Sequence, residues 1–497
     1  MLETAIIIFS VKGVTFLGSM SNGIMVVLLP TIAKDIGLSQ SLTLWPQSVF
    51  SLVCGTFLLL MGNITDIVGS RRAFLFGCIL YSIFTLAQGF CNSGSQLIAF
   101  RAIQGFAMAA CLPSAVSVLT NSFPAGRWRN LGFVMLSVGQ PLGFAVGLVV
   151  SGVLTKTIGW RWIFYISTAI NAAISVGAAF ALPKHLDNHN LKFKDFYDAD
   201  WVGSAIASGA LGTFSYVVAI TSESHRRWSS PSTITLIVLS AILAYAFFFW
   251  VTRQERLGRP CLLPPSLWRN TAFTAICGTV FFTWAAMNAG TLTLTLVFQE
   301  VQHLSPSETS IRLLPDVGSG ILVSILVGYL IDKTSTYWLV VSAAAVALAS
   351  PLLMALMDPA WSYWAAAFPA IFLGPVSTDV LYTVSNLVIT REFPKKTQGL
   401  AGAVFNTLVQ ISTSVGIGLS SLVAAMVMQR AAGAKSIQMV AHDGLVVGGG
   451  NATQWYTGVE LEGYRGSFWT CFGFLAAAVV VAGGWLRDIV DVGKKQD

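Results

Sequence analysis

The hydropathy pattern of the chain is a series of long apolar stretches separated by short polar segments. A helix that crosses the hydrocarbon core of a bilayer needs about 20 mostly apolar residues. Fourteen stretches are long enough, so the sequence predicts an all-α membrane protein with 14 transmembrane helices. The expected spans are residues 8–30, 44–63, 73–91, 96–121, 130–154, 161–182, 201–221, 232–252, 271–298, 312–331, 336–357, 361–390, 398–428 and 466–488.

Composition agrees with this pattern. Hydrophobic residues make up 55% of the chain and charged residues 10%, whereas soluble domains are roughly a quarter charged. Residues 1–10 contain no basic n-region, and the first apolar run is longer than the core of a signal peptide. We therefore expect the N-terminal region to be the first span itself.

The distribution of basic residues predicts the orientation. An even number of spans places both termini on one side. If that side is the cytoplasm, the cytoplasmic segments carry about twice as many Lys and Arg as the outer loops, as the positive-inside rule requires. We predict a multi-pass plasma-membrane protein with both termini cytoplasmic. Topology then accounts for the net charge of +7, and nucleic acid is not an expected partner.

The segment between spans 2 and 3 carries the most specific motif. Gly62, Asp66, Gly69, Arg71 and Arg72 form a G-x-x-x-D-x-x-G-x-R-R pattern. Glycine enters positive φ cheaply, and an acid with paired arginines favours the water-facing edge of a membrane. The pattern resembles the loop between helices 2 and 3 of the major facilitator superfamily of transporters. The resemblance implies a gating loop that contacts the opposite half when the cytoplasmic side closes.

The chain also contains an imperfect internal repeat. Three short markers of the first half recur in the second: Gly62 to Asp66 as Gly328 to Asp332, Phe123-Pro124 as Phe393-Pro394, and Gly159-Trp160-Arg161 as Gly463-Tyr464-Arg465. The repeat predicts two pseudo-symmetric six-helix bundles around a midplane site. The bundles are residues 1–183 and 271–497, the second with a long outer loop at 429–465. Residues 184–270 are then a linker with two inserted helices.

Span 4 contains a charged residue at membrane depth. Arg101, Gln104 and Gly105 lie on one helical face. A charge inside a span costs about 2.5–3.5 kcal/mol on insertion scales, so it usually faces an internal cavity. The string resembles the helix-4 motif of drug:proton antiporters, in which the arginine is linked to proton coupling; Gln104 belongs to the same string. The alternative is an arginine that reaches the outer interface.

Span 5 carries a row of small residues that allows close helix approach. The row is Gly139, Pro141, Gly143 and Gly147. It resembles the helix-5 motif of the antiporters, although Gln140 and Phe144 depart from the family pattern.

Two further segments indicate a branch of this group. Fourteen-helix drug:proton antiporters usually carry an aspartate nine residues before the proline that closes span 1, but here Ser21 precedes Pro30. The surrounding sequence resembles the fungal aminotriazole-resistance branch, as does Gly374 to Asn386 in span 12.

Asp379 is the most deeply placed acid. It lies 14 residues before Phe393, or about 21 Å along a helix, and follows Pro375, which bends the helix. Burial favours the neutral form of a carboxyl group, and a proton carrier must be able to adopt that form. Alternatively, Asn386 or a neighbouring helix holds Asp379 for structure alone. Asp316, after Pro315, is shallower, and its role is left open.

Other polar and aromatic residues within spans predict a cavity for an amphipathic organic molecule. They are Gln47, Gln140, Trp284, Asn288, Tyr382, Asn406 and Gln410. Each could instead hold neighbouring helices together. The seven cysteines show no metal-like spacing and are expected to be packing residues. Asn451, in an Asn-Ala-Thr sequon of the outer loop, is a candidate N-glycosylation site.

These observations predict a secondary active transporter rather than an enzyme. No nucleotide-binding loop, metal cluster or nucleophile elbow is present in the sequence. We expect proton-coupled efflux of small organic or toxic compounds by a monomer, with the proton gradient as energy source and no cofactor. The expected partners are a small-molecule substrate, protons and the lipid bilayer. The alternatives are a proton-coupled importer or uniporter, since fold does not fix direction, and a non-transporting receptor or intramembrane enzyme.

Overall fold

The fold was analysed in a computed structural model. It describes residues 2–38, 42–123, 127–183, 186–187, 200–223, 230–259, 265–331, 333–358, 361–392, 395–442 and 451–487. Every regular element in these residues is helical, apart from a single β-bridge between Gly69 and Asp187. The prediction of an all-α protein is confirmed.

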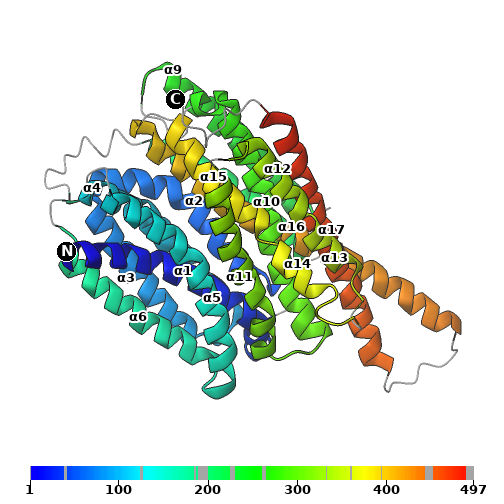
Figure 1. The fold of residues 1–497 in the computed structure, drawn as a ribbon. Coiled ribbons are helices and arrows are strands. Elements are labelled where there is room, and N and C mark those ends of the chain that lie inside the picture. The colour runs from blue at the N-terminus through cyan, green and yellow to red at the C-terminus, as the bar shows by residue number, and fades with distance from the viewer. Residues whose placement is uncertain are drawn as a thin grey trace.

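Six helices build the first half, and they lie side by side in Figure 1. They are α1 (Leu2–Asp35), α2 (Trp45–Val68), α3 (Ser70–Gly89), α4 (Gly94–Ser122), α5 (Arg127–Thr157) and α6 (Trp160–Ala181). Within this half α1 packs on α5, α2 on α4, and α3 on α4 and α6.

The second half contains the remaining long helices. They are α10 (Thr271–Leu296), continued by the π-helical turn η5 (Val297–Val301), then α11 (Pro306–Leu330), α12 (Thr336–Ala347), α13 (Ala349–Leu356), α14 (Ala367–Leu373), α15 (Val376–Glu392), α16 (Lys395–His442) and α17 (Asn451–Trp485). A short 3-10 helix, η4 (Pro265–Arg269), precedes α10.

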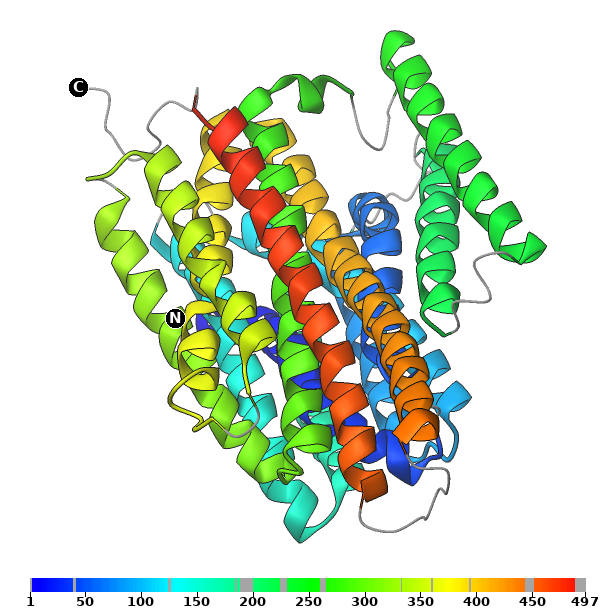
Figure 2. The same ribbon diagram turned by 90° about the vertical axis from the view of Figure 1, so that its right-hand side faces the viewer.

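Two helices lie between the halves in sequence and to one side in space. They are α8 (Trp201–Glu223) and α9 (Pro231–Arg256). Figure 2 shows both beside the main body of helices. Helix α8 makes the contacts with the main body, because it packs on α2 and α16. Ser208 of α8 also donates a hydrogen bond to the carbonyl of Thr56 at 3.2 Å. Most of α9 is exposed, as expected of a helix that faces lipid.

Twelve helical segments among the described residues are long and apolar enough to cross a membrane. The two other expected spans, 130–154 and 201–221, coincide with α5 and α8, whose side chains are only partly described. The total of fourteen spans, the two-bundle division and the limits 1–183, 184–270 and 271–497 stay predictions.

The boundaries of several expected elements were wrong. The segment after Gly62 was expected to be a loop, but α2 continues to Val68 and α3 begins at Ser70, so the turn is Gly69 alone. Its φ of 103° is a conformation that glycine adopts readily. The outer loop expected at 429–465 is also largely helical, because α16 reaches His442 and α17 begins at Asn451. Their ends project from the body in Figure 1.

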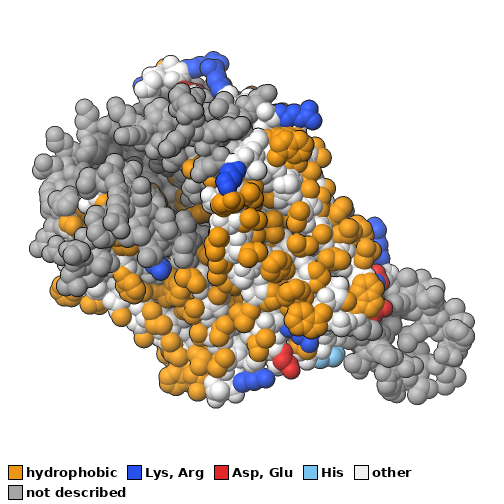
Figure 3. Space-filling view, in the orientation of Figure 1, with side chains coloured by type: hydrophobic (Ala, Val, Ile, Leu, Met, Phe, Trp, Pro, Cys, Tyr) orange, Lys and Arg blue, Asp and Glu red, His pale blue; other side chains and the backbone are white. Residues whose placement is uncertain are grey.

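The surface supports a membrane location. Figure 3 shows a broad face of hydrophobic side chains, with most charged groups near its two ends. Large exposed hydrophobic side chains follow the outward sides of α3, α9 and α11, for example Ile83, Phe248 and Ile325. Apolar groups on such faces are stable against lipid, whereas a soluble monomer rarely exposes so much apolar area.

The largest hydrophobic core joins the two halves. It contains α1 residues such as Leu28 together with Phe298 of η5 and Phe468 of α17. This core lies toward the end of the molecule that holds Asp35, here called the Asp35 end; the opposite end, with Gly69 and Arg71, is the Arg71 end. Gln299 also donates a hydrogen bond to the carbonyl of Val27 at 2.7 Å. The two halves are therefore packed together at the Asp35 end.

Candidate functional site

The first candidate site is a polar cluster around Arg101 on α4. Arg101 has no exposed surface, so it does not reach the membrane interface. Its Nη1 donates to Gln104 Oε1 at 2.8 Å and to Ser21 Oγ at 3.0 Å, and its Nη2 donates to Gln47 Oε1 at 2.8 Å. Its Nε donates to the carbonyl of Pro46 at 3.2 Å. The guanidinium also lies 4.4 Å from the ring centroid of Phe50.

The partners of Arg101 are all uncharged. No ion pair with Arg101 is present among the described residues. At Ser21 the resemblance to the drug:proton antiporters predicts an aspartate, and here the side chain supplies a hydroxyl to Arg101 in place of a carboxylate. Buried charges are normally paired, so oriented dipoles hold the positive charge of Arg101 here.

The glycine row of α5 packs directly on α1. A Cβ atom at Gly143 would overlap the carbonyl oxygen of Phe16, and one at Gly147 would overlap that of Met20. At Gly139 the nearest atom is Cγ of Lys12, at 3.4 Å. Pro141 lies inside α5 between these glycines. The row brings two backbones together and thereby fixes α1 with Ser21 against the rest of the first half.

The arginines of the expected gating loop contact their own half. Arg71 Nη1 lies 3.2 Å from Asp187 Oδ2, and the backbone N–H of Arg72 donates to Asp187 Oδ1 at 3.1 Å. Arg71 Nη2 also donates to the carbonyl of Ala179 at 2.9 Å. Asp187 is buried and follows α6 at the start of the linker. A Cβ atom at Gly62 would have only one distant neighbour. The side chain of Asp66 lies outside the described residues.

The second candidate site lies in the second half, where two expected spans contain a proline. Span 11 comprises α12 and α13, and Leu348 between them keeps an α-helical backbone with φ −57° and ψ −30°. Span 12 comprises α14 and α15, and Gly374 between them is also α-helical. Proline has no N–H, so Pro375 leaves a backbone carbonyl of α14 without its helical partner. Neighbouring helices can satisfy such freed backbone groups inside a membrane protein.

Asp379 lies one helical turn after Pro375. Its backbone N–H donates to the carbonyl of Pro375 at 3.0 Å. A Cβ atom at Gly320 of α11 would lie 2.9 Å from Asp379 Oδ2, so the carboxyl group faces that helix. Asp379 Oδ2 is buried and has no hydrogen-bond partner among the described residues. No hydrogen bond between Asn386 and Asp379 is present among the described residues, and Asn386 Nδ2 donates to the carbonyl of Tyr382 at 2.9 Å.

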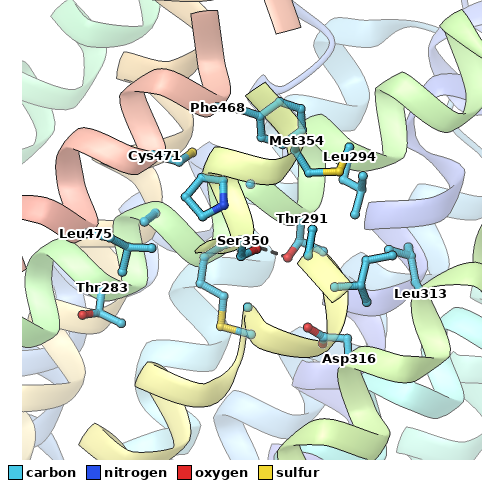
Figure 4. Close-up of a pocket in the computed structure, with 17 residues that line it drawn as sticks. Thr283, Thr291, Leu294, Leu313, Asp316, Ser350, Met354, Phe468, Cys471 and Leu475 are labelled. Carbon is cyan, nitrogen blue, oxygen red and sulfur yellow. Dashed lines mark hydrogen bonds between the residues drawn. The ribbon is translucent and has the colours of Figure 1, made fainter. Parts of the chain in front are cut away.

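Asp316 of α11 lies in the same region, one turn from Gly320. It is within electrostatic reach of Asp379 and lines a cavity of about 50 Å³. In Figure 4 its carboxyl group points toward the middle of the lining side chains. The cavity walls come from α10, α11, α13, α14 and α17, and the residues that line it include Thr283, Met287, Thr291, Ser350, Met354 and Phe468.

The other expected cavity residues do not form one group. Gln47 belongs to the Arg101 cluster. Trp284 and Tyr382 both pack against Phe405, with ring centroids 6.1 and 6.0 Å away. Gln410 packs against Gly55 of α2. Asn288 of α10 and Asn406 of α16 donate hydrogen bonds to backbone carbonyls of their own helices, and Gln140 lies on α5.

Six of the cysteines lie in the described part, and all six are buried and free. Cys261 and the side chain of Asn451 lie outside it.

The sequence was compared with known protein families. The family model described as Major Facilitator Superfamily matches residues 13–417. The chain belongs to the major facilitator superfamily.

Three curated fungal relatives of this superfamily member are similar over most of their length. "MFS-type transporter 1" of Pyricularia oryzae is 40% identical over 97% of this chain and 83% of its own. The "Low affinity ammonium transporter" of Saccharomyces cerevisiae is 26% identical, covering 84% and 78%. The "Aminotriazole resistance protein" of the same yeast is 24% identical, covering 80% and 72%. The resemblance to the aminotriazole-resistance branch is thus confirmed.

A solved structure shares the fold. It is a bacterial homolog of the human lysosomal transporter Spinster, in an inward-facing and unoccupied conformation. It aligns with a TM-score of 0.66 and 14% identity over 98% of each chain.

The sequence analysis missed one feature of this transporter and left the role of another open. Asp187 was not considered, because nothing in the linker sequence distinguishes it from other acids. Asp316 was left open, and its proximity to Asp379 depends on how α11 packs against α15. Its spacing from Pro315 was a usable signal, because prolines within spans often mark functional breaks.

Proposed function

We propose that this protein is a proton-coupled transporter that exports small organic or toxic compounds. The observation that supports it best is the carboxyl oxygen Oδ2 of Asp379, which is buried without a hydrogen-bond partner among the described residues and faces Gly320, one turn from Asp316. Ionisable groups inside spans commonly mark proton or substrate pathways. A carboxyl oxygen without a hydrogen-bond partner can accept and release a proton while its surroundings stay in place.

Arg101 supports coupling from the other half. Its charge is buried and is held only by neutral groups. A movement of α1 or α2 would therefore take these neutral groups away from the guanidinium. The electrostatic potential between the two halves would change, and no ion pair would have to break first. We propose that Arg101 and Gln104 respond to the protonation of the acids, whereas Asp379 carries the proton.

The names of the relatives bear on direction. A resistance protein, and an efflux pump of Aspergillus terreus that is 24% identical, favour export. The ammonium transporter favours a second candidate, a proton-coupled importer of a small solute. The gating role of Gly62, Asp66, Gly69, Arg71 and Arg72 belongs to both candidates, since alternating access requires a gate in either direction.

We also propose a plasma-membrane location with both termini in the cytoplasm, a monomeric working unit and glycosylation of Asn451. The distribution of Lys and Arg supports the orientation.

The test uses inside-out vesicles that contain the full chain. A pH gradient with an acidic lumen is imposed, and uptake of a panel of labelled cationic, neutral and anionic compounds is measured. Proton-coupled export predicts accumulation that stops when a protonophore collapses the gradient. Accumulation only with the reversed gradient would favour the importer, and equal uptake with no gradient would exclude proton coupling.

A further inference from the structure

We propose that the cavity beside Asp316 binds a small protonated amine, with Asp316 as its counter-ion and Asp379 as a second acid nearby. This inference rests on the proposed transport function and names a substrate class for one of its sites.

The acidic residues at the cavity indicate that its ligand is positively charged. Asp316 lines the cavity. Asp379 is not among the lining residues, but its Oδ2 faces Gly320, one turn after Asp316 on α11. No Lys, Arg or His is among the lining residues within the described part of the chain. Two carboxylates in an apolar surrounding are costly to ionise together without a cation. A cationic ligand removes that cost, so the cavity selects against anions.

A second observation indicates a ligand that donates hydrogen bonds. Thr283 is 1% exposed, lines the cavity, and its hydroxyl oxygen has no hydrogen-bond partner among the described residues. Thr283, Met287 and Gly290 share one face of α10. Ser350 and Thr291 add further hydroxyl groups to the wall (Figure 4). An ammonium group offers its N–H donors to such oxygen atoms.

Size and lining restrict the rest of the ligand. A water molecule needs about 10–15 Å³ of such space, so a cavity of about 50 Å³ holds a ligand of only a few non-hydrogen atoms. Met287, Met354 and Phe468 contribute apolar and polarisable surface. A bare metal ion would lack oxygen ligands on that side, whereas the methyl group of methylammonium packs there. The ring of Phe468 can also attract the cation.

The arrangement couples the amine to protons. The charge of the Asp316 carboxylate is neutralised either by a proton or by the ammonium group, so the two compete for the same site. A conformational change that exposes the cavity alternately at each end would then exchange one for the other.

Equilibrium binding tests the inference without transport. The purified full-length protein in nanodiscs is titrated with methylammonium chloride by calorimetry, with sodium chloride at equal ionic strength and tetraethylammonium chloride as comparisons. We expect saturable binding of methylammonium alone, weakened at lower pH. Asp316→Asn should lower the affinity at least about tenfold, whereas Asp358→Asn, between the spans, should not.

A second variant tests the cavity by its size and is expected to fold normally. A Cβ atom at Gly290 would meet nothing closer than Cys471 Sγ at 4.0 Å, so Gly290→Ala should fold and narrow the cavity. It should weaken methylammonium binding, whereas Gly318→Ala, with no atom within 4 Å, should not. The inference is overturned if sodium or tetraethylammonium binds as well as methylammonium, or if Asp316→Asn and Gly290→Ala bind normally.

The two proposals fail separately. Protein that accumulates compounds in response to a pH gradient but does not bind methylammonium retains the proposed function and loses this inference. Protein that binds methylammonium but shows no gradient-driven transport of any compound retains the site and loses proton coupling.

Discussion

Arg101 Nη1 donates a hydrogen bond to Ser21 Oγ at 3.0 Å in the interior of the first half. The resemblance to the drug:proton antiporters predicts an aspartate at this position, so a hydroxyl stands here where that resemblance implies a carboxylate. Buried charges are normally paired, whereas the groups that accept hydrogen bonds from Arg101 are all neutral.

The first prediction restores the missing charge. Ser21→Asp places a carboxylate beside a guanidinium that is already desolvated, so we expect a higher thermal midpoint of unfolding. Ser21→Asn introduces a side chain of the same size as aspartate but without its charge, so it should not raise the thermal midpoint. Both are measured on purified protein in the same detergent. Equal midpoints would show that the neutral partners already compensate Arg101 fully.

The second prediction concerns Arg101 itself. Arg101→Ala leaves the acceptors of four hydrogen bonds without their donor. We expect gradient-driven transport to fall about a hundredfold, equivalent to about 2.8 kcal/mol. Arg101→Lys keeps the charge but loses the planar fork, so it should retain part of the activity. Unchanged transport by the alanine variant at equal expression would assign Arg101 a role in packing alone.

The third prediction separates coupling from binding at Asp379. Asp379→Asn imitates a permanently protonated carboxyl group. We expect uphill transport in vesicles to be lost, while counterflow exchange of the same compound partly survives. Equal loss of both activities would mean that Asp379 holds substrate or structure. Undiminished uphill transport would remove it from the proton pathway.

The fourth prediction concerns the contact between α1 and α5. The backbones are so close at Gly143 that a side chain must displace one helix. Overpacking of this kind costs about 1–3 kcal/mol, so Gly143→Val should lower the thermal midpoint and the yield of folded protein. The matched control is Gly177→Val on α6, where a Cβ atom meets nothing within 4 Å. Identical yields and midpoints would contradict the packing described here.

The fifth prediction tests the contact between Asp187 and the arginines of the Arg71 end. Asp187→Ala frees Arg71 and Arg72 for other partners and so changes the balance between conformations. We expect transport to fall about tenfold, equivalent to about 1.4 kcal/mol, with normal surface expression. Asp187→Glu should restore most of it, because the carboxylate returns. A loss of expression in step with activity would instead indicate a folding role.

The sequence by itself determined the fold class, the family and the positions of most spans. These properties depend on local composition, because about 20 apolar residues in a row can satisfy their backbone groups in lipid only as a helix. The motifs at Gly62, Arg101 and Gly139 are also local, and they were sufficient to indicate the superfamily before any contact was known.

Only the tertiary structure decided which distant residues meet. The partners of Arg101 come from α1, α2 and α4, and the partner of Arg71 comes from the linker after α6. Asp316 became a candidate because it lines a cavity between α10, α11, α13, α14 and α17, and because α11 also packs against α15. Helix ends also needed the structure, since polar residues such as Asn63 and Thr65 continue α2 as far as Val68 instead of ending it. Such pairings depend on packing between segments far apart in the chain, which the order of residues does not specify.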